Sequence, residues 1–343
     1  MRNTIKVNIR LSIIFLVALI SHSTLLSAAT WRYAHEENKG DVQDVFAVAF
    51  KEHIEKNSEH AIQIFRFGEL GESDDIMEQT QSGILQFVNQ SPGFTGALIP
   101  EAQIFFIPYL MPTDKDAVVE FFRTSKAINE DFVELYAKQG LSLLQMYPEG
   151  EMVITVDEPV TRPEDFAGKK IRVMTNPLLS ATYEAFGATP TPLPWGEVYG
   201  ALQTNMIQGQ ENPIFWIESG GLYEVSPNLV FTRHGWFTTA MMANQNFYQS
   251  LSKEEKKLVQ EASQHAFEQV IAHIDGLADR ALAKIQKASS KVTVTRLNDQ
   301  QIALFKAKAP AVEKTFIEMT GASGKQLLEQ FKADLKQVTQ PAK

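Results

Sequence analysis

The strongest constraint on the fold is an alternation of short apolar runs with amphipathic stretches, which begins at residue 31 and continues along most of the chain. Short runs rich in aromatic and β-branched residues, such as residues 31–35 and 61–65, are typical of strands. Between these two runs, Asp41 precedes apolar residues at three- and four-residue spacing, a pattern that predicts a capped helix. Strands and helices that alternate in this way predict an α/β fold.

The same pattern occurs a second time, which predicts two lobes. Residues 152–156 and 170–175 are predicted strands, and Pro177 and Gly187 mark the start and the end of a helix. Two α/β units of similar size, joined more than once, predict a cleft between the lobes. We expect the first lobe to comprise residues 30–152 plus about 240–275, and the second lobe to comprise residues 153–239 plus about 276–343.

Two stretches of the sequence predict how the lobes are connected. Residues 251–289 keep apolar residues at helical spacing after a capping box formed by Ser252 and Glu255. A helix of about 36 residues is about 54 Å long at 1.5 Å per residue, so we expect it to span both lobes. Gly276 weakens this helix by about 1 kcal/mol relative to alanine, which leaves two consecutive helices as the alternative. Residues 189–194 include three prolines and predict an extended connection.

The first 29 residues have the features of a secretory signal peptide. Arg2, Lys6 and Arg10 give a positive start, an apolar stretch follows at residues 11–26, and small residues at 27–29 provide a cleavage site. A membrane anchor is the alternative, but roughly 10 strongly apolar residues are fewer than the ~20 that span a bilayer. Cleavage removes three positive charges and changes the net charge from -9 to -12. We therefore expect a soluble periplasmic protein.

The composition excludes several classes of protein. The chain has no cysteine, which excludes disulfides and thiolate metal sites, and its 41 acidic residues against 32 basic residues argue against a nucleic-acid partner. The seven histidines have no metal-ligand spacing, and the sequence contains no phosphate-binding loop, dinucleotide fingerprint or serine-hydrolase elbow. We therefore predict a binding protein without catalytic residues, metal ions or cofactors, and not an enzyme.

A few aromatic and polar residues at the ends of predicted strands are candidates for a ligand site. Phe94 follows the Ser91-Pro92-Gly93 turn at the carboxyl end of a predicted strand, where α/β sheets place ligand-binding loops. Arg172 lies within an apolar strand, where a guanidinium needs an anionic partner, either an internal carboxylate or a ligand carboxylate. The candidates, for each of which a core position is the alternative, are Glu37, Phe94, Arg172, Trp195, Tyr199, Asn212, Phe215, Trp216, Trp236 and Phe237.

Several motifs resemble the DctP-type solute receptors of TRAP transporters, over essentially the whole mature chain. They are Phe67-Gly-Glu-Leu-Gly71, Ala167-Gly-Lys-Lys-Ile-Arg-Val-Met174, Phe186-Gly-Ala-Thr-Pro-Thr-Pro192, Trp195-Gly-Glu-Val-Tyr-Gly-Ala-Leu-Gln203 and Gly209-Gln-Glu-Asn-Pro213. In this family the arginine of the second motif binds the ligand carboxylate and the asparagine of the last motif assists it. The resemblance therefore implies these roles for Arg172 and Asn212.

Further motifs resemble the ectoine-binding members of that family. They are Trp31-Arg-Tyr-Ala-His-Glu-Glu37, Gly40-Asp-Val-Gln-Asp-Val-Phe46, Val88-Asn-Gln-Ser-Pro-Gly-Phe-Thr-Gly96 and Asn212-Pro-Ile-Phe-Trp-Ile-Glu-Ser-Gly220. The resemblance implies that Glu37 binds the amidinium nitrogens of ectoine or 5-hydroxyectoine, and that Arg172 and Asn212 bind the carboxylate. The residues implied to enclose the ring are Phe94, Trp195, Trp216 and Phe237. An acid, an arginine and aromatic faces are complementary to a small zwitterion with an apolar ring.

The resemblance also implies a mechanism and partners. Its fold is the two-lobed periplasmic solute-binding fold, also called a Venus flytrap, which closes around the ligand. Closure is expected because Glu37 and Phe94 belong to the first predicted lobe, whereas the second contains Arg172, Trp195, Asn212 and Trp216. The closed receptor, a monomer, is expected to deliver its ligand to the ion-driven membrane permease of the transporter.

Three alternatives to ectoine capture stay open at this point. Glu151 follows the predicted Glu149-Gly150 turn, where many relatives have a second arginine, so dicarboxylates and sialic acids are disfavoured as ligands. Another small zwitterion or carboxylate in the same fold is the main alternative, and the sequence does not rank ectoine against 5-hydroxyectoine. An enzyme would turn its ligand over, and a structural or adhesive exported protein would not be stabilised by a ligand.

Overall fold

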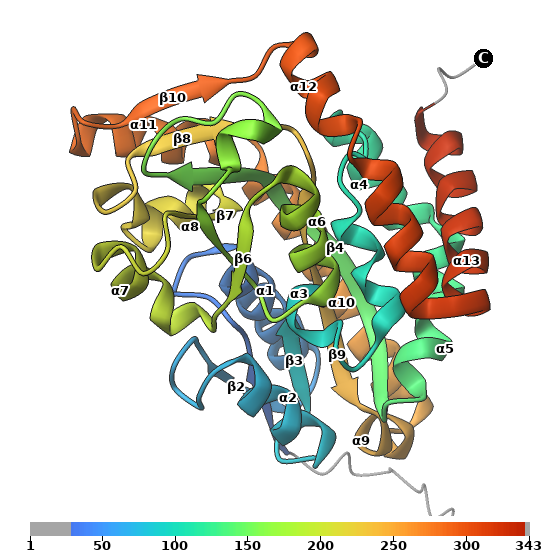
Figure 1. Cartoon of the computed structure of the whole chain (residues 1–343). Coiled ribbons are helices and arrows are strands. Elements are labelled where there is room, and N and C mark those ends of the chain that lie inside the picture. The colour runs from blue at the N-terminus through green and yellow to red at the C-terminus, as the bar shows by residue number, and fades with distance from the viewer. Residues whose placement is uncertain (1–28, 340–343) are drawn as a thin grey trace, which may run out of the picture.

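The computed structural model describes residues 29–339 of the 343-residue chain (Figure 1). The predicted signal peptide lies outside the described residues, apart from Ala29. Within the described range, no helix combines the length and the apolar character that crossing a membrane requires.

The described residues contain ten strands that form one hydrogen-bonded sheet. The order along its main path is β2-β1-β3-β9-β4-β7-β5-β6, while β8 pairs with β4 and β10 pairs with β8. The strands are β1 (Thr30–Ala34), β2 (Ala61–Phe65), β3 (Phe87–Gln90), β4 (Leu141–Val156), β5 (Lys170–Val173), β6 (Thr189–Pro192), β7 (Gly209–Pro213), β8 (Asn228–Phe231), β9 (Trp236–Asn244) and β10 (Thr293–Arg296).

The strands divide into two groups that β4 joins. In the first strand group, β1 is parallel to β2 and β3, and β9 is antiparallel to β3. In the second strand group, β5 is parallel to β6 and β7, and β8 is parallel to β10. β4 pairs with β9 up to Glu151, and from Met152 to Val156 it pairs with β7 and β8. This arrangement confirms the predicted two-lobed α/β fold.

The helices pack on the two strand groups and connect them. α1 packs on β2 and α10, α11 packs on α8, and the long C-terminal helix α13, which bends at Gly321, packs on α4 and α6. In Figure 1 the blue elements of the first group lie below the green and yellow elements of the second. The helices are α1 (Val42–Asn57), α2 (Ser73–Gln81), α3 (Pro92–Thr95), α4 (Lys115–Thr124), α5 (Phe132–Ala137), α6 (Pro177–Phe186), α7 (Val198–Gln203), α8 (Ile214–Ser219), α9 (Gln245–Ser250), α10 (Lys253–Ile274), α11 (Leu277–Ala288), α12 (Asp299–Lys306) and α13 (Ala309–Thr339).

The helix predicted over residues 251–289 is divided in two, so the prediction of one continuous helix is wrong and the alternative of two consecutive helices is confirmed. Ser252 and Glu255 do form the capping box of α10, with hydrogen bonds of 3.1 and 2.7 Å. The helix ends at Ile274, because Asp275 is extended and Gly276 takes a left-handed φ of 64° that an α-helix cannot continue through. The pair still connects both halves of the fold, since α10 packs on α1 and α11 on α8.

The proline-rich connection predicted at residues 189–194 is partly a strand. β6 is the last strand in the order of the sheet and pairs in parallel with β5. Thr189 and Leu193 donate their N–H groups toward β5. Because successive residues of a strand point their N–H groups in opposite directions, the nitrogens of Pro190 and Pro192 lie on the open edge, where the missing N–H costs no sheet hydrogen bond.

The left-handed residue between α10 and α11 gives a stability prediction. Gly276→Ala should lower the free energy of unfolding by about 1–2 kcal/mol, because a Cβ is strained in this conformation. Gly200→Ala is the matched control, because Gly200 is exposed in α7, has no left-handed φ, and has open space where the Cβ would lie. Urea denaturation measures both variants, and equal stability of the two would contradict the prediction.

Candidate ligand-binding site

The predicted site residues lie at strand ends or in the short helices that follow the strands. Glu37 follows β1, and Phe94 lies in α3, directly after β3. The others are Arg172 in β5, Trp195 in the 3-10 turn η4 (Trp195–Glu197) after β6, Asn212 in β7, Trp216 in α8 and Phe237 in β9. Parallel strands bring their carboxyl ends to one edge of a sheet, which explains why residues far apart in sequence are collected here. Trp195 is half-buried, and the other six are buried.

Three of the predicted site residues, Trp195, Trp216 and Phe237, form one continuous aromatic cluster. The rings of Trp195 and Trp216 have centroids 4.6 Å apart, and those of Trp216 and Phe237 are 5.4 Å apart with their planes nearly perpendicular. The guanidinium carbon of Arg172 lies 6.0 Å from the centre of the Trp195 ring. Trp216 Nε1 is buried and has no hydrogen-bond partner among the described residues. The cluster therefore combines apolar faces with one unused donor.

Arg172 is a buried cation that no internal carboxylate pairs with directly. Its side chain is only 2% exposed, and Nε and Nη2 donate to the Leu193 carbonyl oxygen at 3.0 and 2.8 Å. Within the described residues, no carboxylate oxygen lies within 4.0 Å of the guanidinium. Burial lowers the pKa of Arg172 to about 10, so the group keeps its charge at neutral pH. Of the two partners considered from the sequence, a contacting internal carboxylate is therefore not found.

A short chain of hydrogen bonds fixes the amide of Asn212. Asn212 Nδ2 donates to Gln210 Oε1, and Gln210 Nε2 donates to Thr155 Oγ1 at 3.1 Å. Gln210 is the register partner of Arg172 across the parallel β5–β7 pair. Since residues two apart in a strand share a face, Asn212 lies on the same face as Gln210. The side chains of Arg172 and Asn212 thus project from adjacent strands on the same face of the sheet.

Buried acidic groups gather directly after β1, in the first strand group. Glu37 is fully buried; its Oε2 accepts from the Gln43 backbone N–H at 2.7 Å, whereas Oε1 has no partner among the described residues. Burial, followed by the charge of Glu149, raises the pKa of Glu37 well above its usual range. Glu36 Oε2 accepts from the Ser91 N–H at 2.9 Å, which ties the end of β1 to the turn that carries Phe94. Burial raises the pKa of Glu36 to about 8.

Neighbours of Phe94 and Glu37 contact the segment after β5 and the strand β9. Gly93, next to Phe94, lies so close to Met174 that an added Cβ would meet its sulfur atom, and Asn176 Nδ2 donates to the Pro92 carbonyl oxygen at 3.3 Å. These contacts place α3 against the segment that follows β5. On the acidic side, Gln43 Nε2 donates to Thr239 Oγ1 at 3.1 Å, two residues along β9 from Phe237.

Glu149 belongs to this region but was not among the site residues predicted from the sequence. The segment Pro148-Glu149-Gly150 reads as a turn, but it lies inside the 16-residue strand β4, so the predicted turn is wrong. The register with β9 shifts between Pro148 and Gly150, which makes Glu149 the extra residue of a β-bulge. Its side chain is buried, and Oε1 accepts from Gln43 Nε2 and Thr239 Oγ1. Glycine and proline beside an acid signal an irregular position, but they do not distinguish a bulge from a turn.

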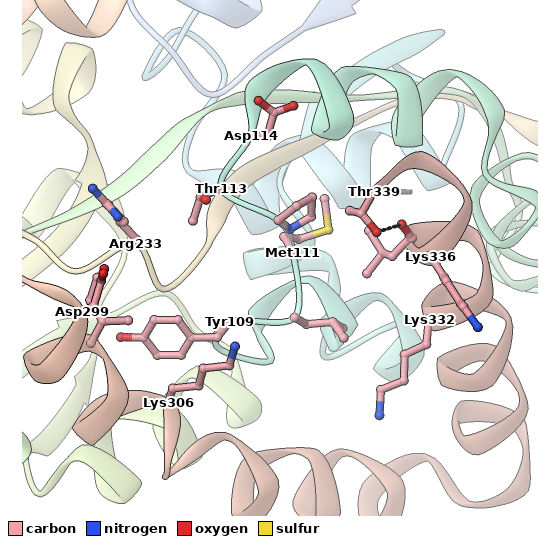
Figure 2. Close-up of a pocket in the computed structure, with 14 residues that line it drawn as sticks. Tyr109, Met111, Thr113, Asp114, Arg233, Asp299, Lys306, Lys332, Lys336 and Thr339 are labelled. Carbon is pink, nitrogen blue, oxygen red and sulfur yellow. Dashed lines mark hydrogen bonds between the residues drawn. The ribbon is translucent and has the colours of Figure 1, made fainter. Parts of the chain in front are cut away.

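A separate groove on the surface contains none of the seven predicted residues (Figure 2). It has a volume of about 610 Å³ and lies between the 109–114 segment, α12 and the end of α13. In Figure 2, Arg233 and Asp299 stand on one side, and Lys332 and Lys336 on the other. Within the 29–339 range, no group of three or more His, Asp or Glu residues is arranged to hold a metal ion.

The chain is similar over most of its length to known periplasmic binding proteins. Residues 33–319 match the family described as bacterial extracellular solute-binding protein, family 7 (DctP). The ectoine-binding periplasmic protein TeaA of Halomonas elongata is 71% identical over 320 residues, which cover 93% of this chain and 94% of that protein. The ectoine/5-hydroxyectoine-binding periplasmic protein UehA of Ruegeria pomeroyi is 58% identical over 316 residues, covering 92% and 93% of the two chains.

The backbone of a solved structure also matches the fold of this chain. The periplasmic ectoine-binding protein of the TeaABC TRAP transporter of Halomonas elongata superimposes with a TM-score of 0.89 at 73% sequence identity, covering 90% of this chain and 99% of that one. Motif resemblance, overall sequence match and backbone match thus agree over nearly the same residues. The chain belongs to the DctP family, the bacterial extracellular solute-binding proteins of family 7.

Proposed function

We propose that this chain is the solute receptor of a TRAP transporter, which captures ectoine or 5-hydroxyectoine between its lobes and delivers it to the membrane permease. The observation that carries the proposal is the presence of one buried cation and one buried acid, each with unused hydrogen-bonding capacity, on the two strand groups. A buried arginine without a contacting carboxylate lies in β5 of the second strand group, and a buried glutamate with an unbonded oxygen follows β1 of the first. The names of the TeaA and UehA relatives support this choice of ligand.

The arginine end is suited to a carboxylate. Arg172 uses Nε and Nη2 on the Leu193 carbonyl, which fixes the plane of the guanidinium and leaves Nη1 available. Asn212 is oriented by Gln210 on the neighbouring strand. A carboxylate placed here would receive a charge-assisted hydrogen bond in a buried site, where such bonds are roughly twice as strong as neutral ones. Arg172 and Asn212 are therefore assigned to the ligand carboxylate.

The other end is suited to a delocalised cation with an apolar ring. Glu37 offers Oε1 to N–H donors, while Oε2 stays on the Gln43 N–H. Phe94, Trp195, Trp216 and Phe237 are assigned to the ring of the ligand. Each contact of a cation with an aromatic face contributes about 0.5–2 kcal/mol once water is removed. A strongly hydrated zwitterion gains affinity in such a site because its charged contacts strengthen as water leaves.

Closure of the lobes is part of the proposal. We assign residues 30–152 plus about 240–275 to the first lobe, and residues 153–239 plus about 276–343 to the second. Ser219 donates to Asp41 Oδ2 at 3.0 Å, and Gly196 lies against the Glu72 side chain, so the two lobes as assigned touch beside the site. A ligand that contacts Glu37 on one lobe and Arg172 on the other stabilises this closed arrangement over an open one.

The receptor acts by binding and not by catalysis. The relatives with assigned roles are binding proteins, and the site offers charges and aromatic faces without an activated nucleophile. Removal of residues 1–29 as a signal peptide would place the mature protein in the periplasm, the location that the names of both relatives state. There it would work as a monomer that carries its ligand to the permease.

Arg172→Ala should lower affinity for ectoine by at least a hundredfold, about 2.7 kcal/mol, because the ligand carboxylate loses its charged partner. The fold should be retained, since no internal carboxylate that contacts Arg172 is left unpaired. Calorimetry measures the affinity, and thermal unfolding checks the fold. Arg32→Ala, at an exposed position of β1, is the control and should bind normally. Unchanged ectoine affinity in Arg172→Ala would overturn the assignment.

Glu37→Gln should weaken ectoine binding by more than tenfold, about 1.4 kcal/mol or more, because the amide cannot neutralise the ligand cation. The side chain keeps its size and an oxygen for the Gln43 N–H, so the loss reports on charge. Glu52→Gln, an exposed substitution on α1, controls for the change in net charge. Equal affinities of the Glu37→Gln variant and the unmodified protein would remove Glu37 from the site.

A ligand panel tests the identity of the solute. Ectoine and 5-hydroxyectoine should each raise the melting temperature, because a ligand at a hundred times its Kd stabilises the native state by about 2.7 kcal/mol. Succinate and sialic acid should not, since the site pairs one cation with one anion and Glu151 adds a carboxyl group beside it. Stabilisation by another small zwitterion but not by ectoine would favour the alternative ligand in the same fold.

A further inference from the structure

Glu149 forms a buried pair with Glu37 that none of the proposed ligand contacts explains. The two side chains are 1% and 0% exposed. Gln43 bridges them, since its backbone N–H donates to Glu37 Oε2 at 2.7 Å and its side-chain amide donates to Glu149 Oε1 at 3.2 Å. The second oxygen of each, Glu37 Oε1 and Glu149 Oε2, has no hydrogen-bond partner among the described residues. The two carboxyl groups lie close enough for each to act on the pKa of the other.

A hydrogen bond between two carboxyl groups requires a proton, because a carboxylate oxygen can only accept. Two buried carboxylates side by side would repel strongly, and retention of one proton removes this repulsion. Burial raises the pKa of both Glu37 and Glu149, and the Glu149 carboxyl group raises the pKa of Glu37 further. The pair thus behaves as one unit that keeps a proton above the ordinary carboxyl range.

The β-bulge explains why Glu149 points at Glu37. In a regular strand, Glu149 would oppose a residue of β9, but the register passes from Pro148–Thr238 to Gly150–Phe237 and leaves Glu149 without a partner. Bulges redirect a side chain at the cost of one ladder position, and they are common next to functional sites. Thr239 Oγ1 holds the redirected carboxyl group from the β9 side.

The other titratable groups around the pair come from several elements. Behind Glu149 lies a cavity of about 220 Å³ whose lining also includes Glu151, Lys115 and Asp279. The groups that act on Glu37 or that Glu149 acts on are Glu36 and Asp41 before α1 and Tyr147 in β4. Burial raises the pKa of Asp41 to about 7. Lys115, the cation that lines the same cavity, pairs with Asp275, so the ligand would supply the cation that faces Glu37.

We propose that Glu149 is a positioning residue for ligand capture, which shares a proton with Glu37 in the free receptor and releases it when the cationic group of the ligand binds at Glu37. The proposal rests on the proposed function, because it requires a ligand cation at Glu37. The step is a proton transfer only: the carboxyl O–H bond of the pair breaks, its electron pair stays on the oxygen, and the proton passes to solvent. The carboxylate pair then faces the ligand cation.

The direction of the pH effect follows from linkage. A nearby cation stabilises the ionised form of a carboxyl group, so the bound ligand lowers the pKa of the pair relative to the free receptor. By reciprocity, loss of the proton increases the affinity for the cation. Ectoine affinity should therefore rise as the pH increases through the raised pKa of the pair, and ligand binding should release protons in that range.

Calorimetric titration with ectoine tests this proposal, in two buffers of different ionisation enthalpy and from neutral to mildly alkaline pH. The unmodified protein should release protons on binding. Glu149→Gln should release less than about half as many and lose the rise of affinity with pH. At neutral pH its affinity should stay within about threefold, because the amide donates to Glu37 as the carboxylic acid did. Glu52→Gln, at an exposed position of α1, should behave like the unmodified protein.

Thr239→Val provides a second variant that keeps both acids. The hydroxyl group of Thr239 donates to Glu149 Oε1 and thereby favours the ionised carboxylate. Its removal should raise the pKa of Glu149, so the proton release should move to higher pH. Equal proton release by Glu149→Gln and the unmodified protein, or an unshifted profile in Thr239→Val, would overturn the role of Glu149. Absence of ectoine binding in the unmodified protein would instead overturn the proposed function, so the two failures are distinct.

Discussion

The pairing of β4 along its whole length is the constraint on which the rest of the structure depends. Over its first part it pairs with β9 of the first strand group, and over its last five residues it pairs with β7 and β8 of the second. Phe237, Asn212 and Glu149 all take their positions from this strand or its immediate neighbours. One strand therefore sets both the connection between the halves and the spacing of groups that we assign to the ligand.

Charge is arranged along the site in a way that the fold alone does not require. Arg172 keeps its charge because its pKa, although lowered by burial, is still about 10, and a backbone carbonyl orients its guanidinium. The acids at the other end are crowded and buried, which raises the pKa values of Glu36, Glu37 and Glu149. Without a bound ligand, the buried arginine and the buried acids lower the free energy of unfolding, since buried charges and shared protons are tolerated only where surrounding contacts fix them. Such costs are expected where binding, and not packing, has determined the residues.

Sequence patterns predicted local features well and long-range features poorly. Residues 61–65 and the helix from Pro177 to Gly187 agree with β2 and α6, because strand composition and end signals act within a few residues. The length of β4 was missed, since Pro148 and Gly150 look like turn residues and only pairing with β9 makes them part of a strand. Six of the seven site residues lie in the quoted family motifs, whereas Phe237 and Glu149 lie outside them.

The prolines of β6 affect whether the open edge of the sheet can pair with a second molecule. β6 ends the sheet, and an open strand edge offers unpaired N–H groups to any other extended chain. The two nitrogens that face outward belong to Pro190 and Pro192, which cannot donate. A strand from a second molecule thus finds no donors at these two positions. The motif that carries the family resemblance therefore also disfavours edge-to-edge pairing between molecules at this strand.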